Sequence, residues 1–255
     1  MAYSPDFRTY PGARQSATAS SALLDAGLRS YMLRVYNWMT SGLLLTGIVA
    51  YLIANTDAIN AFYPVAQNGI RTAGPLAMIS MFAPLGFVLV LSFGVNKLSR
   101  TAAQTLYWVF CAAMGASLTN IFLIYTDVVI VRVFFITAGT FAAMSLWGYT
   151  TRTDLTRFGS FLIMGLFGVI IASLANMFFQ STQLQFLVSI VGVLVFVGLT
   201  AFDTQRIKST YVQYAYAEGT DLAAKRSVYD ALSLYLNFIN LFLLMLQLFG
   251  GGNRR

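Results

Sequence analysis

Long apolar segments dominate this sequence and constrain its fold more than any other feature. An α-helix needs about 20 apolar residues to cross a bilayer, and its backbone polar groups must be paired within the segment because lipid offers no partners. The sequence therefore predicts an all-α integral membrane protein with seven transmembrane helices. We place these helices at Tyr31–Leu52, Pro75–Val95, Ala102–Tyr125, Val128–Trp147, Phe158–Phe178, Leu184–Asp203 and Val228–Phe249.

The composition agrees with a membrane domain and leaves little chain for a soluble one. Of the 255 residues, 58% are hydrophobic and 10% are charged, whereas roughly 25% of the residues of a soluble domain are charged. We expect a disordered cytoplasmic N-terminal tail at residues 1–30, a seven-helix membrane domain at residues 31–250 and a short C-terminal tail at residues 251–255. The N-terminal tail lacks the apolar centre of a secretory signal peptide.

The basic residues are divided unevenly between the two sides of the predicted membrane domain. Lys and Arg concentrate in cytoplasmic loops, so the sequence predicts a cytoplasmic N-terminus and a C-terminus outside. The net charge of +7 is then an orientation signal, and we expect no nucleic-acid partner. One side receives Arg8, Arg14, Arg29, Arg34, Lys97, Arg100, Arg152, Arg157, Arg206, Lys208, Lys225 and Arg226, and the other receives Arg71, Arg132, Arg254 and Arg255.

The sequence lacks the residues that several kinds of catalytic and metal-binding site require. The sequence has no histidine and a single cysteine, Cys111, so it has no imidazole ligand or proton relay and no cysteine cluster for a metal. It also lacks the common nucleotide-binding, metalloprotease and hydrolase motifs and the glycine-rich aspartate motifs of intramembrane proteases. We expect neither an enzyme nor a bound cofactor.

Polar residues near the last two apolar segments form the candidate site. Asp203 ends the sixth segment, Asp230 begins the seventh, and Asn237 and Asn240 lie further along it; such groups are costly at membrane depth and are usually functional. Each of these residues also has a purely structural interpretation, and all of these stay open. For Asp230 it is a cap at the N-terminus of the last helix, and for the two asparagines it is interhelical hydrogen bonding. For Asp203 it is an interfacial position with an ion pair to Arg206.

Two C-terminal motifs resemble the signature of the Bax inhibitor-1 family in its bacterial branch. They are Gly198-Leu-Thr-Ala-Phe-Asp-Thr-Gln-Arg-Ile-Lys208 and Ala231-Leu-Ser-Leu-Tyr-Leu-Asn-Phe-Ile-Asn-Leu-Phe242. The stretches Met114–Phe122 and Gly148–Leu155 are similar to bacterial members too, and the resemblance extends from about Tyr31 to Gly250. It implies a last helix enclosed by the other six and a pH-sensitive calcium leak controlled by two facing aspartates.

One of these two aspartates is replaced in this chain. Asp203 matches the first, whereas the position of the second is occupied by Asn237. Two neighbouring carboxylates titrate as a coupled pair, and an Asp–Asn pair has no second acid with which to share a proton. The sequence therefore predicts a passive calcium-permeable leak in the bacterial inner membrane, gated near the cytoplasmic ends of helices 6 and 7, with weakened pH sensing.

The predicted ion pathway and pH sensor comprises Asp203, Asn237 and Asp230, with Arg206 and Asn240 in support. Calcium prefers hard oxygen ligands, so Asp203 is also the candidate calcium ligand. The expected partners are the lipid bilayer and calcium ions. A second interpretation is a non-conducting interaction protein that modulates a membrane-bound quality-control protease through its N-terminal tail.

Overall fold

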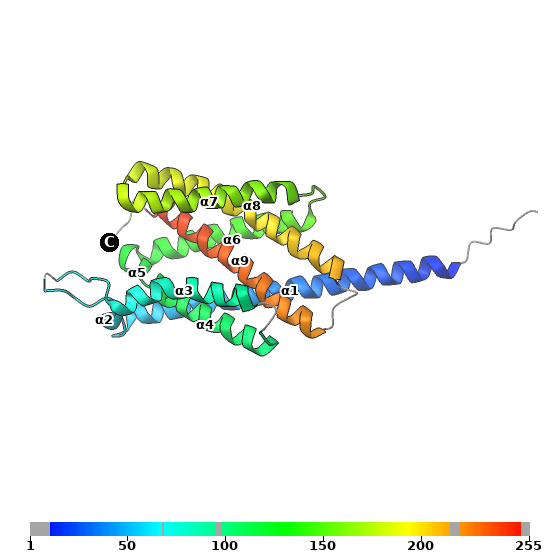
Figure 1. The fold of residues 1–255 in the computed structure, drawn as a ribbon, viewed down its shortest axis with the longest axis horizontal. Helices are drawn as coiled ribbons and strands as arrows, with labels where there is room; N and C mark the ends of the chain where they lie inside the picture. The colour runs from blue at the N-terminus through cyan, green and yellow to red at the C-terminus, as the bar shows by residue number, and fades with distance from the viewer. Residues whose placement is uncertain (1–10, 68, 95–97, 215–219, 251–255) are drawn as a thin grey trace, which may run out of the picture.

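The computed structural model describes residues 11–67, 69–94, 98–214 and 220–250, and most of these residues are helical. Figure 1 shows the helices gathered into one elongated bundle, with the N-terminal part of α1 projecting beyond it. The only β-type pairing among the described residues is an isolated bridge between Val65 and Arg71. The helices are α1 (Pro11–Asn55), α2 (Ile59–Phe62), α3 (Pro75–Gly94), α4 (Arg100–Leu118), α5 (Ile121–Ile124), α6 (Asp127–Thr150), α7 (Thr156–Phe179), α8 (Thr182–Tyr214) and α9 (Thr220–Phe249).

The predicted all-α membrane architecture is confirmed. In the described part of the chain, six helical stretches are long and apolar enough to cross a membrane, and α3 adds a shorter apolar helix over Pro75–Leu91. The seventh crossing therefore stays a prediction. The six stretches are Leu24–Asn55, Arg100–Ile124, Asp127–Thr150, Thr156–Phe179, Thr182–Gln213 and Leu222–Phe249.

The last helix, α9, lies in the middle of the bundle. Its principal contacts are with α1, α4, α6 and α8, whereas α3 packs mainly against α4 and α7 packs against α8. Figure 1 shows α9 crossing diagonally between these neighbours. The direct surroundings of α9 are thus four helices, and α3 and α7 form an outer layer, which is a smaller enclosure than the six helices that we expected.

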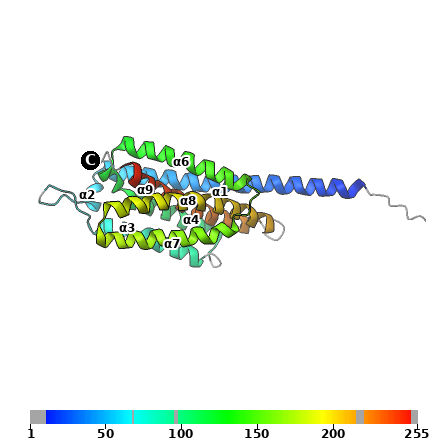
Figure 2. The same ribbon diagram turned by 90° about the horizontal axis from the view of Figure 1, so that it is seen from above.

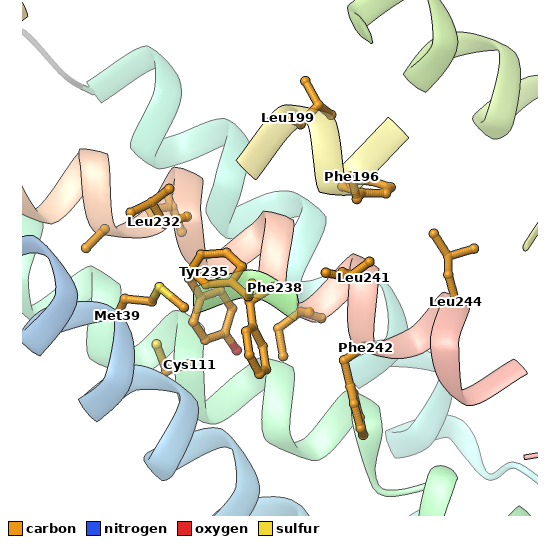
Figure 3. Close-up of a cluster of buried hydrophobic side chains, with 14 of the residues drawn as sticks. Met39, Cys111, Phe196, Leu199, Leu232, Tyr235, Phe238, Leu241, Phe242 and Leu244 are labelled. Carbon is orange, nitrogen blue, oxygen red and sulfur yellow. The ribbon is translucent and has the colours of Figure 1, made fainter. Parts of the chain in front are cut away.

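The core surrounds the middle of α9, where large side chains interdigitate (Figure 3). Tyr235 is fully buried, and its ring lies edge-on to Phe110 at 5.4 Å and to Tyr107 at 6.3 Å between ring centroids. Its hydroxyl shares a 2.6 Å hydrogen bond with the hydroxyl of Thr46, which also lies 2.9 Å from the backbone oxygen of Cys111. These buried polar groups are therefore paired, as an apolar surrounding requires.

The helices extend further into the polar segments than hydropathy indicated. Residues 24–30 are helical and Leu28 is buried, so the predicted disordered tail is wrong over this stretch, while residues 1–10 and 251–255 lie outside the described residues. At the other polar segment, α8 continues to Tyr214 and α9 already begins at Thr220. Polar turns continue these helices because their backbone hydrogen bonds do not depend on apolar side chains.

Close backbone contact fixes α8 against its neighbours beside Asp203. A Cβ atom at Gly148 of α6 would meet the backbone oxygen and Cα of Ala201, and one at Gly159 of α7 would meet the ring of Phe202. Glycine allows two helices to approach this closely where lipid supplies no hydrophobic driving force. The contact with Gly148 holds α8 by its backbone two residues before Asp203.

Candidate functional site

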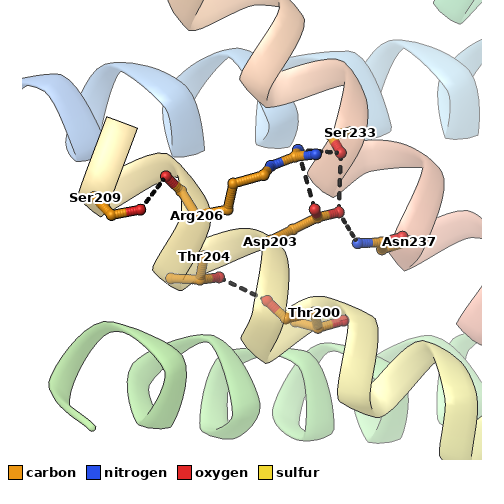
Figure 4. A network of polar contacts seen from close by, with 7 residues as sticks. All are labelled: Thr200, Asp203, Thr204, Arg206, Ser209, Ser233 and Asn237. Carbon is orange, nitrogen blue, oxygen red and sulfur yellow. Dashed lines mark hydrogen bonds and ion pairs between the residues drawn. The ribbon is translucent and has the colours of Figure 1, made fainter. Parts of the chain in front are cut away.

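The helices α8 and α9 bring Asp203, Arg206, Ser233 and Asn237 into one polar network (Figure 4). The Oδ2 atom of Asp203 accepts hydrogen bonds from Ser233 Oγ at 2.9 Å and from Asn237 Nδ2 at 2.7 Å. Its Oδ1 atom pairs with the Arg206 guanidinium at 3.0 Å. The guanidinium also donates to Ser233 Oγ at 3.1 Å. Ser233 and Asn237 reach the same carboxylate because residues four apart lie on one face of a helix.

The network is buried at its centre and reaches the surface through arginine. Asp203 and Asn237 are 6% and 7% exposed, whereas the Arg206 side chain is 47% exposed. Asp203 lies within the apolar helical stretch Thr182–Gln213, about 15 Å along the axis from its end at Gln213. The carboxylate is therefore inside the bundle, and its cationic partner forms the outer boundary of the site.

The buried carboxylate of Asp203 has polar partners on both of its oxygen atoms. Both carboxylate oxygens have donors, and one of these donors is a cation. A buried carboxylate needs such compensation, because desolvation of a charge otherwise costs several kcal/mol. Arg206 thus occupies the Oδ1 side of the carboxylate. The expected pairing of Asp203 with Arg206 and the expected contact with Asn237 are therefore both present.

A chain of hydroxyl groups on the other side of α8 supports this region, and we did not predict it. Ser145 Oγ shares hydrogen bonds with Thr204 Oγ1 at 2.9 Å and with the Tyr36 hydroxyl at 2.6 Å. These bonds connect α1, α6 and α8 next to Asp203. The available signal was the occurrence of single hydroxyl residues within otherwise apolar helices, which is typical of interhelical hydrogen bonding.

Asp230 belongs to a different contact from Asp203. It accepts a 2.6 Å hydrogen bond from the hydroxyl of Tyr31 on α1, and the Tyr31 ring lies 4.9 Å from that of Tyr211 on α8. The capping interpretation is wrong, because α9 begins at Thr220, well before Asp230. Asp230 therefore connects α1 to α9.

Asn240 is not drawn into the network around Asp203. Its side-chain nitrogen donates to the backbone oxygen of Leu236 in its own helix at 2.8 Å. Among the residues that the structure describes, no group of three or more His, Cys, Asp or Glu side chains could hold a metal ion. Oxygen ligands for a cation at Asp203 would therefore have to include the neighbouring hydroxyl and amide groups.

Comparison with known proteins places these residues in a family context. The family described as "Inhibitor of apoptosis-promoting Bax1" matches residues 28–254. An uncharacterized protein of Rickettsia prowazekii is 45% identical over 241 residues, which cover 94% of this chain and 96% of the relative. An uncharacterized protein of Caulobacter vibrioides is 45% identical over 232 residues, covering 89% and 91%.

A third relative carries information on location. The inner membrane protein YbhL of Escherichia coli is 44% identical over 230 residues, which cover 90% of this chain and 94% of the relative. Together with the apolar helices described above, this similarity supports a multi-pass protein of a bacterial inner membrane. The match over residues 28–254 includes all four residues of the Asp203 network. The chain belongs to the Bax inhibitor-1 family.

Proposed function

We propose that this protein is a passive calcium-permeable leak whose gate is the network of Asp203, Arg206, Ser233 and Asn237. The observation that carries the proposal is a buried carboxylate within a membrane-spanning helix whose ion-pair partner is a half-exposed arginine. Ionisable groups inside membrane proteins commonly mark ion pathways. The positive-inside distribution of charge supports a gate in the cytoplasmic half of the membrane as part of this proposal.

The proposed opening step is the release of Arg206 from Asp203. The guanidinium lies at the exposed edge of the site, so its movement into water needs no rearrangement of the core. Its departure leaves the carboxylate oxygens beside the Ser233 hydroxyl and the Asn237 side chain. Calcium prefers such oxygen ligands, and a single carboxylate binds it weakly enough for release to the other side.

Calcium flux into liposomes tests this function directly. Proteoliposomes with an entrapped calcium indicator should show flux above that of protein-free liposomes. Asp203→Asn should lower the flux because it removes the buried charge. Asp154→Asn is the matched control, since Asp154 is an exposed carboxylate at the loop before α7. Flux equal to that of protein-free liposomes for the folded wild-type protein would refute the leak.

The pH dependence of the flux is proposed to be weak because the second position is an amide. Asn237 Nδ2 lies 2.7 Å from Asp203 Oδ2, so Asn237→Asp would place two carboxylates within hydrogen-bonding distance, where they would share a proton. Flux through this variant should change steeply with pH between about pH 6 and 8, unlike flux through the wild type. Asn240→Asp, one turn away, should not have this effect. A steep wild-type response that Asn237→Asp leaves unchanged would contradict this account.

A second candidate function is a non-conducting protein that modulates a membrane-bound quality-control protease. The observation that favours it is the part of α1 that projects beyond the bundle (Figure 1), which offers a helical surface to a partner. The same flux measurement distinguishes the two functions, because a folded protease modulator would conduct no calcium.

A further inference from the structure

A large groove lies between α1 and α6, and none of the four residues of the Asp203 network lines it. Its volume is about 1010 Å³, and its floor is formed by Phe238, Ile239 and Phe242 of α9. The helices α1 and α6 are not among the principal packing pairs of the described bundle. Residues of both helices line the groove, and Figure 2 shows α6 and α1 running in the same direction along the bundle. The three side chains of the floor are only 3%, 5% and 7% exposed, so α9 closes the groove on its inner side.

The groove is as long as the apolar layer of a membrane. Its wall on α1 extends from Arg29 to Ala50, which corresponds to about 31 Å at 1.5 Å per residue. The hydrocarbon core of a bilayer is about 30 Å thick. The length of the groove thus matches the thickness of the lipid-tail layer, so a hydrocarbon chain can lie along it.

The surface of the groove suits hydrocarbon rather than a polar ligand. Leu44, Phe135 and Leu146 line it and are 60%, 69% and 64% exposed. Two of its hydroxyl groups, on Tyr36 and Ser145, bond to each other across the groove at 2.6 Å. These hydroxyls already have partners, so an apolar occupant leaves them satisfied.

One end of the groove carries a positive charge. Arg29 lines this end, is exposed and forms no ion pair with a described residue. Its guanidinium can therefore bind a phosphate group with charge-assisted hydrogen bonds. An apolar groove with a cation at one end is complementary to a lipid with an anionic head group.

We infer that the groove between α1 and α6 binds one anionic glycerophospholipid. One acyl chain lies along α9, and the head-group phosphate binds Arg29 in the leaflet at that end of the bundle. The lipid completes the packing between α1 and α6, which are joined by the Tyr36–Ser145 hydrogen bond but are not a principal packing pair. This site contains none of the four residues of the proposed calcium gate, so it does not depend on whether the protein conducts ions.

Native mass spectrometry of the full-length protein tests the site. The protein is delipidated in detergent and then offered equal amounts of phosphatidylglycerol and phosphatidylcholine with identical acyl chains. Wild-type protein should retain one phosphatidylglycerol. Ala142→Phe should lose it, because Ala142 lines the groove, whereas Ala143→Phe places the same side chain on an exposed position outside the lining. Equal retention by these two variants would overturn the proposal.

A second pair of variants tests the opposite wall. A Cβ atom at Gly47 meets no atom within 4 Å, and Gly47 lines the groove; Gly168 on α7 is equally open but lies elsewhere. Gly47→Phe should lose the lipid and Gly168→Phe should keep it, which also covers the case in which Ala142→Phe fails to fold. A dimer that disappears only in the groove variants would overturn the proposal by showing that a second copy fills the groove.

The head-group contact has its own test. Arg29→Gln should lower the preference for phosphatidylglycerol over phosphatidylcholine about fivefold, the factor that corresponds to about 1 kcal/mol per basic residue at an anionic surface. Arg34→Gln is the matched control, because Arg34 is on the same helix but faces a different depression beside Trp38 and Trp108. An equal change in both variants would show general surface attraction and refute a specific head-group site.

Discussion

Arg206→Gln should open the proposed leak. In the observed arrangement the guanidinium contacts Asp203 Oδ1 at 3.0 Å and Ser233 Oγ at 3.1 Å. Glutamine keeps a polar side chain on the same helix but removes the positive charge and shortens the reach of the side chain. The Asp203 carboxylate then keeps only its two neutral donors, Ser233 and Asn237. The closed arrangement should therefore lose stability relative to an open one.

The size of this loss follows from the exposure of the pair. Unit charges about 4 Å apart attract each other by about 4 kcal/mol at an effective dielectric constant near 20. The Arg206 side chain is 47% exposed, and surface ion pairs contribute only about 0–1 kcal/mol. A value of about 1–2 kcal/mol for this half-buried pair is therefore reasonable. Such a change alters the ratio of two states about 5–30-fold, so flux should rise by this factor.

Proteoliposome calcium flux measures the effect, with Lys208→Gln as the matched control. Lys208 lies on the same helix, donates to the backbone oxygen of Tyr149 at 2.8 Å and stacks over the ring of that residue. Its removal changes the local charge equally but leaves the Asp203 network intact. If both variants raise the flux by the same factor, surface charge explains the effect and the gating argument fails. Unchanged flux in Arg206→Gln would also refute it.

Three further predictions concern topology and packing. Reporter fusions at the C-terminus and between α8 and α9 should fall on opposite sides of the membrane, and two cytoplasmic signals would show that the predicted orientation is wrong. Leu234→Ala should lower stability in detergent by about 2–5 kcal/mol, because Leu234 is fully buried, whereas Leu194→Ala at a 66% exposed position should have little effect. Tyr31→Phe should cost about 1–3 kcal/mol, because Asp230 loses its hydrogen bond. A thermal transition equal to that of the wild type would contradict this assignment.

The sequence indicated the centre of the site better than its surroundings. Asp203 and Asn237 face each other at 2.7 Å, as the paired motifs led us to expect. The partner of Asp230 is Tyr31, 199 residues away in the chain, and helical spacing within one segment carries no information on such a contact. The hydrogen-bond partner of Asn240 could not be predicted either, because an asparagine on an inner face can donate to another helix or to the backbone of its own helix.

Helix ends and helix neighbours were the weakest predictions for a physical reason. Hydropathy locates the apolar centre of a span, but the backbone hydrogen bonds of α8 continue through polar residues to Tyr214. Hydropathy also treats every span alike, because each must face either lipid or other apolar helices. The arrangement of the helices depends on small residues at crossings, such as Gly192 of α8 against Leu244 of α9 and Gly148 of α6 against Ala201 of α8.

The close contact between Gly148 and Ala201 acts as a fulcrum for α6 and α8. At this point the backbones of the two helices lie against each other, so the helices cannot move closer here and a tilt of either one would pivot about the contact. Displacements then grow with distance along each helix and are smallest beside Asp203, two residues away. A swing that moves the far ends of these helices by several ångströms reaches the carboxylate as a small shift. The site would therefore be insensitive to bending of the outer part of the bundle and would respond mainly to events at its own end.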